Sequence, residues 1–421
     1  MAAATQTIHS AAEPGIKSTQ RLDSVVRKPI LDLRGRVHAY ELLFRRDLDG
    51  IAVEKNLLET AAHFNLEKPS ELKKLTGKLT AFVRCPVEAL SEQLAQVLPA
   101  SLTVLEIGPC HEFSPEQAAI CLQLKSLGFR FAVNDPCAES KHETLAEFAD
   151  YIKVDFDKTT AEMRLGLLKE LQHPPITMLA NGVHTHADFE EARREGFLLF
   201  EGYYFCEPVA MRNRRPPVNQ MLRLDILKAL QQHPMNLPKV SQLVKRDGPI
   251  TFQLLRLVNS PMWGMRQNVE SIEVALVAIG ESAFRRIVTL AIAGELNGDQ
   301  PAELLSLAIT RGHICEAMAS KRGLDPFGQY LLGLLSLLPA MQGQPMSEVA
   351  RTLPLADEIV EALLGKRNPE RAILTWLENF ERGDWAGCNA AAEADSLDQG
   401  ELSKAYVEAL AWAETALHPG A

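Results

Sequence analysis

The sequence has few of the features that mark secreted, membrane-spanning or zinc-binding chains. Its seven cysteines are an odd number and include no Cys-x-x-Cys pair, which favours reduced thiols in a cytosolic protein. Residues 1–20 lack the basic start and apolar run of a secretion signal and are interpreted as a flexible tail. The longest apolar stretch, Tyr330 to Met341, is far short of the about 20 residues of a membrane span, so we expect a buried helix there.

An excess of positive charge is also missing. The formal net charge is -10, so a phosphate backbone would repel the chain as a whole, which disfavours nucleic-acid binding. Two basic stretches, residues 212–215 and 239–246, lie near acidic residues and are interpreted as solvated surface. A hydrophobic content of 46% with 23% charged residues is typical of a globular protein, and 421 residues favour two domains, or three.

The first half alternates short β-rich runs with amphipathic helical patterns, which predicts a parallel sheet covered by helices. The expected strands are 37–43, 79–83, 102–107, 129–133, 151–154, 176–180 and 198–205. The expected helices between them include 53–64, 115–127, 161–171 and 187–195. Seven or so such strands predict a β/α barrel with its site at the carboxyl ends of the strands.

The second half has no strand signal and reads almost entirely as helix. Apolar residues at helical spacing, such as Leu254, Leu257 and Val258, indicate a bundle. The expected helices are 217–232, 239–246, 250–259, 271–279, 282–296, 302–322, 326–338, 347–352, 370–382 and 402–417. The predicted domains are therefore a tail (1–20), an α/β barrel (21–211) and an all-α domain (212–421).

Short polar motifs follow the predicted strands in a recognisable order. They are Lys28-Pro29-Ile30, Tyr40-Glu41-Leu42-Leu43-Phe44-Arg45, Leu105-Glu106-Ile107, Asn134-Asp135, Tyr151-Ile152-Lys153-Val154-Asp155, Leu179-Ala180-Asn181-Gly182-Val183-His184-Thr185 and Glu201-Gly202-Tyr203. Together they resemble the EAL domain, a family that hydrolyses cyclic di-GMP at a two-metal site in a TIM-like barrel. The resemblance runs from Lys28 to Pro208 and is specific in order and spacing.

The resemblance implies roles for several residues. Glu41 and Glu106 fall on family ligands of Mg²⁺ or Mn²⁺, and Lys153 falls on the catalytic lysine. Arg45 matches the arginine that contacts a phosphate, and Lys28 stands where the family has glutamine, which makes the barrel mouth more attractive to an anion.

Other positions depart from the family. Two-metal hydrolysis needs several carboxylates that converge on the ions. Arg84 replaces an asparagine ligand, and Asn181 replaces a glutamate. Asn134 replaces the first aspartate of a pair, whereas the second aspartate is kept as Asp135. In addition, His184 replaces a glutamate.

Arg84 is the most damaging of these changes, because a guanidinium has no acceptor and cannot ligate a metal. We hypothesise that Arg84 pairs with Glu41 and Glu106 and replaces the metal, so that Glu41, Glu106, Asn134, Asp135, Lys153 and Asn181 are vestigial. Two alternatives stay open: these carboxylates bind a partner or ligand, or they still hold a metal.

The remaining polar residues of this half have plainer interpretations. Lys153 is predicted to pair with Asp135 or Asp155. His184 and His186 lack a nearby carboxylate pattern and are expected to face solvent.

Two segments of the second half resemble the HDOD domain, a helical signalling module related to HD-type phosphohydrolases. They are Leu254 to Pro261 and Ser271 to Gly280. A working HD site needs a His-Asp pair, but this chain has Ser336 where related domains have that histidine, and His313 stands alone and is expected to be packed or capping. Both halves together resemble the YuxH-type EAL-HDOD signal transduction proteins.

The expected function is non-enzymatic signalling through contacts with other signalling proteins in the bacterial cytoplasm, without a metal cofactor, a membrane or a nucleic acid. Residual cyclic di-GMP phosphodiesterase activity and cyclic di-GMP binding without hydrolysis are the alternatives, and a homo-oligomer is compatible with the sequence. Met262, Trp263 and Met265 follow a helix end at Asn259-Ser260-Pro261; they either fill the core or form a partner surface.

Overall fold

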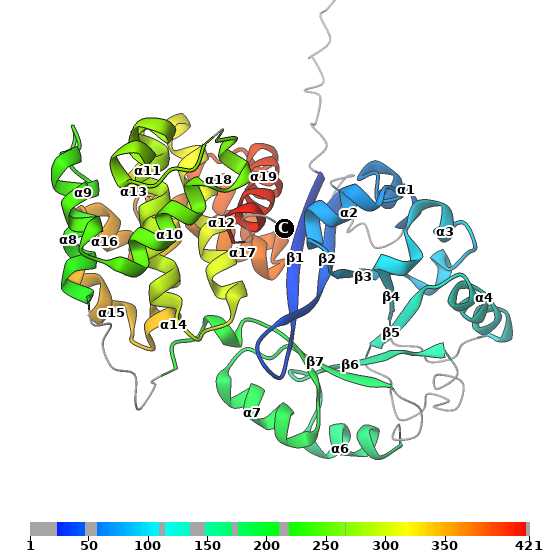
Figure 1. Cartoon of the computed structure of the whole chain (residues 1–421). Helices are drawn as coiled ribbons and strands as arrows, with labels where there is room; N and C mark the ends of the chain where they lie inside the picture. Colours follow the sequence, from blue (N-terminus) through cyan, green and yellow to red (C-terminus); the bar gives the residue numbers. More distant parts are fainter. Residues whose placement is uncertain are drawn as a thin grey trace, which may run out of the picture.

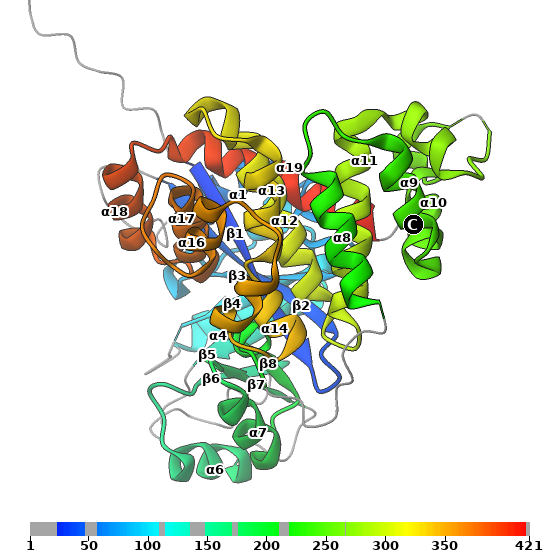
Figure 2. The same cartoon turned by 90° about the vertical axis from the view of Figure 1, so that its left-hand side faces the viewer.

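The computed structural model describes residues 23–46, 57–108, 114–134, 148–170, 176–209, 219–265 and 267–417. A barrel of strands lies beside a body of helices (Figures 1 and 2). The predicted tail and the predicted domain boundary near residues 212–218 lie outside the described residues. No helix in the described ranges has the length and apolarity that a membrane crossing requires.

Eight strands close the barrel in sequence order. They are β1 (Asp23–Asp32), β2 (Val37–Arg46), β3 (Thr80–Arg84), β4 (Thr103–Ile107), β5 (Arg130–Asn134), β6 (Tyr151–Asp155), β7 (Thr177–Asn181) and β8 (Leu199–Glu201). Strands β2 to β8 are parallel neighbours, whereas β1 is antiparallel to both β2 and β8.

The predicted strands correspond to β2 through β8, with two corrections. The last strand is shorter than predicted, because a 3-10 turn at Tyr204–Cys206 follows it. The first strand, β1, was missed, because Lys28 and Pro29 interrupt its apolar pattern and proline is rare inside a sheet.

Helices cover the outside of the barrel. They are α1 (Leu57–His63), α2 (Pro69–Thr76), α3 (Leu94–Val97), α4 (Pro115–Ser126), α6 (Ala161–Glu170) and α7 (His186–Glu195). Local sequence fixes where α4 and α7 begin: Ser114 and Thr185 each accept from the backbone three residues on, in reciprocal capping boxes with Gln117 and Asp188.

The barrel interior is filled by one apolar side chain from each strand. These are Ile30, Ala39, Phe82, Val104, Ala132, Tyr151, Leu179 and Leu199, which form a cluster separate from the main core. Because side chains alternate along a strand, the residue two positions away in each strand also faces inward, one layer closer to the barrel mouth.

The helical half contains α8 to α19. Their bounds are α8 (Gln220–Leu230), α9 (Leu237–Lys245), α10 (Gly248–Val258), α11 (Ile272–Asn297), α12 (Ala302–Ala319), α13 (Pro326–Leu335), α14 (Leu338–Gln342), α15 (Met346–Val349), α16 (Asp357–Leu363), α17 (Arg371–Arg382), α18 (Trp385–Asp395) and α19 (Gln399–Leu417). The two helices predicted at 271–279 and 282–296 are the two parts of α11, which the non-helical backbone of Gly280 separates by a kink. The apolar stretch from Tyr330 to Met341 is split between α13 and α14 and is largely buried, as predicted.

The two halves meet along β1, which α17 and α19 contact directly (Figure 1). Arg27 of β1 is buried there, with Nη2 3.8 Å from Glu303 Oε1 and Nη1 donating to the Leu75 carbonyl at 3.0 Å. Glu303, on α12, also accepts from the Tyr40 hydroxyl at 2.8 Å. Charged groups at this depth are tolerated only when paired, so Arg27 and Glu303 tie barrel and helices together.

Glu303→Ala is therefore expected to lower the free energy of unfolding by about 3–5 kcal/mol, because it leaves a buried guanidinium without its counter-charge. Urea denaturation of the full chain measures this. Glu393→Ala, on the exposed surface of α18, is the matched control and should cost little. Equal effects of the two changes would contradict the role given to Glu303.

Candidate functional site

The barrel mouth is closed by a polar layer that lies two residues along each strand from the apolar layer. Its members are Lys28, Glu41, Arg84, Glu106, Asn134, Lys153, Asn181 and Glu201. Three side chains of this layer are cationic, three are carboxylic and two are amides. For seven of the eight, all except Glu201, the sequence pattern had predicted a role in the family's site or in its loss.

Lys153 is at the centre of this layer. Its ammonium is 2% exposed and lies 3.3 Å from Glu41 Oε1, 3.2 Å from Glu106 Oε2 and 2.9 Å from Glu201 Oε2. The predicted pairing of Lys153 with Asp155 was wrong, since Asp155 pairs with Lys158 at 2.6 Å. The other predicted partner, Asp135, lies outside the described residues.

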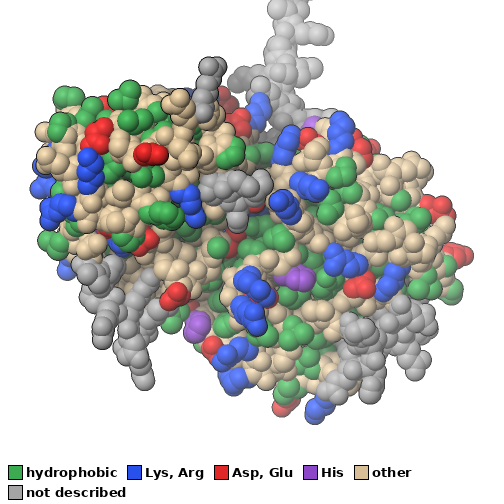
Figure 3. Space-filling view, viewed as in Figure 1, with side chains coloured by type: hydrophobic (Ala, Val, Ile, Leu, Met, Phe, Trp, Pro, Cys, Tyr) green, Lys and Arg blue, Asp and Glu red, His purple; other side chains and the backbone are tan. Residues whose placement is uncertain are grey.

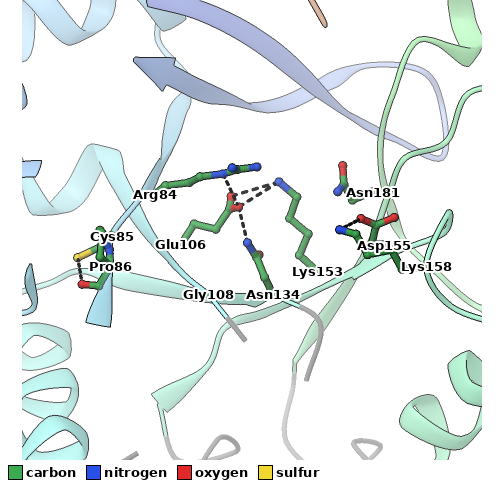
Figure 4. Close-up of a pocket in the computed structure, with 10 residues that line it drawn as sticks. All are labelled: Arg84, Cys85, Pro86, Glu106, Gly108, Asn134, Lys153, Asp155, Lys158 and Asn181. Carbon is green, nitrogen blue, oxygen red and sulfur yellow. Dashed lines mark hydrogen bonds and ion pairs between the residues drawn. The ribbon is translucent and has the colours of Figure 1, made fainter. Parts of the chain in front are cut away.

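Arg84 reaches the same carboxylates from the rim. Its Nε lies 3.1 Å from Glu41 Oε1 and 3.6 Å from Glu106 Oε1, while 44% of its side chain is exposed. Figure 4 shows Arg84 and Lys153 pointing toward Glu106 from opposite sides. The guanidinium therefore lies between two strands that each supply a carboxylate.

The two asparagines differ in their contacts. Asn134 Nδ2 donates to Glu106 Oε1 at 2.7 Å, so that oxygen faces an amide, an ammonium and a guanidinium. Asn181 lines the cavity outside the layer, together with Lys158 and Asp155 (Figure 4). This mouth cavity has a volume of about 360 Å³.

The three glutamates of the layer differ in the direction in which their pKa is shifted. Burial, reinforced by the neighbouring Glu41 carboxylate, raises the pKa of Glu201 from 4.5 to about 8. Burial alone would raise the pKa of Glu41 too, but Lys153, a hydrogen bond with Glu201 and Arg84 together hold it well below its ordinary value. Burial raises the pKa of Glu106 despite Lys153. Burial and the Glu41 carboxylate thus favour the protonated form of Glu201 near neutral pH.

The carboxylates of this layer face cations among the described residues. The inward oxygens of Glu41 and Glu106 already face the ammonium of Lys153 and the guanidinium of Arg84, and neither cation can act as a ligand. Across the described ranges, no three histidine, cysteine, aspartate or glutamate side chains are arranged to hold a metal ion.

Arg45, the predicted phosphate-binding residue, contacts the helical half. Its Nη2 donates to Asn389 Oδ1 at 2.8 Å and its Nη1 to Gln399 Oε1 at 3.4 Å. The guanidinium carbon lies 5.6 Å from the centre of the Trp385 ring. Arg45 is 9% exposed, so these helices cover much of its side chain.

Other predicted residues lie away from the barrel mouth or at its edge. His184 is exposed, with Nε2 3.1 Å from Asp157 Oδ2, and His186 starts α7 and is about half-buried. His313 stacks on Trp412, with ring centres 5.2 Å apart, as expected of a packed histidine. Ser336 accepts from Arg311, whose guanidinium pairs with Glu381.

The structure describes two of the three proposed partner side chains and five of the seven cysteines. Trp263 and Met265 are partly buried against the core, and nothing is described of the Met262 side chain. Cys85, Cys121, Cys206, Cys315 and Cys388 are free thiols, while Cys110 and Cys137 lie outside the described residues.

The sequence-based prediction missed two sets of contacts, those of Glu201 with Lys153 and those of Arg45 with the helical half. The contacts of Glu201 could have been predicted by counting two residues along each strand from its inward-facing apolar residue. This count places the side chains of Glu201, Glu41 and Lys153 inside the barrel in the same layer. No local signal points to the second set, since Asn389 and Gln399 lie more than three hundred residues away in the chain.

Comparisons with known proteins agree with this two-part architecture. Residues 216–339 match the HDOD domain family. The chain is 28% identical over 401 residues to the uncharacterized protein YuxH of Bacillus subtilis, covering 92% of this chain and 97% of YuxH. It is 26% identical over 401 residues to the cyclic di-GMP phosphodiesterase CdgJ of Vibrio cholerae, covering 93% of this chain and 92% of CdgJ.

Solved EAL structures align with part of the chain. The PaMucR phosphodiesterase in complex with c-di-GMP aligns at 15% identity and a TM-score of 0.36, covering 48% of this chain and 94% of its own. A standalone EAL protein of Vibrio cholerae O395 aligns at 21% identity and a TM-score of 0.34, covering 45% and 92% respectively.

The proton on Glu201 predicts a pH dependence of stability. Between pH 4.5 and about 8 the folded protein holds a proton at Glu201 that the unfolded chain has lost, so the free energy of unfolding should fall as pH rises through this range. Glu201→Gln mimics the protonated acid and should flatten this slope in urea titrations between pH 5 and pH 8. Glu162→Gln, exposed on α6, is the control. An unchanged slope in Glu201→Gln would contradict a proton at Glu201.

Proposed function

Because this chain is an EAL-HDOD protein, we propose that its EAL-like barrel does not hydrolyse cyclic di-GMP and that the chain transmits a signal through protein contacts. The observation that carries this proposal is the position of Arg84, whose Nε lies 3.1 Å from Glu41 Oε1 and 3.6 Å from Glu106 Oε1. A fixed positive charge beside these carboxylates would repel the metal ions that hydrolysis needs to polarise a phosphate and to lower the pKa of an attacking water.

The charges of the polar layer support the same conclusion. A divalent ion entering this layer would have to displace an ammonium that three glutamates surround, or lie next to the Arg84 guanidinium. Asn134 and Asn181 add amide oxygens but no further negative charge to offset that repulsion. The barrel thus retains the family's shape and has exchanged its metal chemistry for internal ion pairs.

A second candidate is residual phosphodiesterase activity, and two observations favour it. The relative CdgJ is named a cyclic di-GMP phosphodiesterase. Glu41, Glu106 and Lys153 also lie together at the barrel mouth, as a family site would require. A third candidate, binding of cyclic di-GMP without hydrolysis, is compatible with the proposed signalling role.

Turnover separates the first two candidates. Purified full-length protein incubated with cyclic di-GMP and Mn²⁺ should release no linear dinucleotide above the level of a Glu41→Ala control, as followed by chromatography. Product formation that Glu41→Ala abolishes would establish the enzyme and refute the proposal.

The affinity of the barrel mouth for Mn²⁺ tests directly whether Arg84 prevents metal binding. A unit charge about 4 Å from an ion contributes roughly 4 kcal/mol at an effective dielectric constant of 20. Arg84→Asn, which restores the family residue, should therefore tighten Mn²⁺ binding in calorimetry by at least about tenfold. Arg194→Asn, on exposed α7, is the control. Tight Mn²⁺ binding by the unmodified protein would refute the assignment of Arg84.

A further inference from the structure

The seam between barrel and helical half runs along the rim of the barrel mouth. Helix α17 ends at Arg382, and the next residue, Gly383, has φ +73 and packs directly on the barrel. A Cβ at Gly383 would lie 2.8 Å from Leu43 Cδ1 and 3.9 Å from Lys28 Nζ. This approach brings the end of α17 next to the Lys28 ammonium.

Further contacts hold the two sides of the seam together. The Tyr203 hydroxyl donates to the Glu381 carbonyl at 2.6 Å, directly before Arg382. Arg45 donates to Asn389 on α18, on the other side of the same turn. The turn after α17 is therefore fixed against β1, β2 and the loop after β8.

Two cavities border this turn, and Lys28 and Arg382 line both of them. The smaller, of about 310 Å³, is also lined by Arg84, Phe44 and Trp385. Its described lining contains three cationic side chains and no carboxylate. The larger, of about 520 Å³, extends toward His184 and Glu207 and contains the protonated Glu201.

Lys28 and Arg382 lack a close counter-charge in the part of the chain that is described. No described carboxylate forms an ion pair with either side chain, although Lys28 attracts Glu41 and Glu201 from a longer distance. Their positive charges come from different halves of the chain, and both side chains line the same two cavities. Figure 3 shows basic side chains gathered along the junction of the two halves.

We propose that Lys28 and Arg382 form a binding site for a phosphate group at the domain seam, which both halves of the chain must supply. A phosphate between them would relieve their mutual repulsion and accept charge-assisted hydrogen bonds, two of them from the planar guanidinium. The smaller cavity leaves room beside the phosphate for a larger ligand against Phe44 and Trp385. The bound group would fasten α17 to β1.

This inference goes beyond the proposed function, since anion binding at the seam and hydrolysis at the barrel mouth are measured separately. Calorimetric titration of the full chain with inorganic phosphate, at ionic strength matched with chloride, should give saturable binding. Each of Lys28→Gln and Arg382→Gln should weaken it by at least about tenfold, because each removes a charged hydrogen-bond donor. Arg194→Gln is the control and should bind as the unmodified protein does.

Parallel titrations with pyrophosphate and cyclic di-GMP identify the source of the phosphate group. Tighter binding of either than of inorganic phosphate, with the same loss in both variants, supports a site for a larger phosphate ester or anhydride. A second readout is hydrogen exchange of residues 381–389, which phosphate should slow in the unmodified protein and not in Arg382→Gln. Absence of saturable binding of all three probes, or Arg382→Gln binding as tightly as the unmodified protein, would overturn the shared site.

Discussion

The barrel mouth depends on one buried charge, the ammonium of Lys153. An ammonium removed from water is unstable unless carboxylates surround it, and Glu41, Glu106 and Glu201 supply them from three other strands. The dependence is mutual, since those carboxylates are themselves almost fully buried. The layer is stable only as a set, with Arg84 contributing a further cation from the rim. In this environment a proton on Glu201 costs less than a third negative charge.

The architecture of the barrel explains why helices of the second half lie so close to this layer. β1 is antiparallel to both of its neighbours and enters the barrel without a preceding barrel helix among the described elements. Its outer side is covered by α17 and α19. Burial of Arg27 with Glu303 fixes that cover, and the turn after α17 consequently reaches the rim at Lys28. Domain docking and the chemistry of the mouth are therefore linked through one strand.

Much of the fold could be predicted from the sequence, because parallel strands and amphipathic helices leave periodic apolar patterns. Seven strands and most of the long helices were recognised, with boundaries shifted by a few residues where caps such as Ser271 fix the helix start. β1 was missed because its apolar pattern is broken by Lys28 and Pro29, which pair with Glu41 and Tyr40 of β2. The order of the polar motifs along the chain also singled out most residues of the polar layer.

The pairing of those residues was less predictable. Lys153 was assigned to aspartates near it in sequence, whereas closure of the barrel brings glutamates from β2, β4 and β8 to it. Likewise, the contacts of Arg45 are set by how two domains dock, which no local pattern encodes. Which charged side chains meet is determined by how the barrel closes. The sequence can reveal only which side chains of each strand face inward, because they alternate along the strand.

The reversed direction of β1 has a practical consequence for work with this protein. Asp23 pairs with Arg46 and Lys28 with Glu41, so the chain enters the barrel from the mouth side and runs toward the closed end. Any fluorescent label, affinity tag or fused partner placed ahead of Asp23 is thus delivered to the rim between barrel and helices, whereas one attached after α19 begins from the helical half. The choice of fusion end therefore decides whether a reporter joins the chain on the mouth side of the barrel or on the helical half.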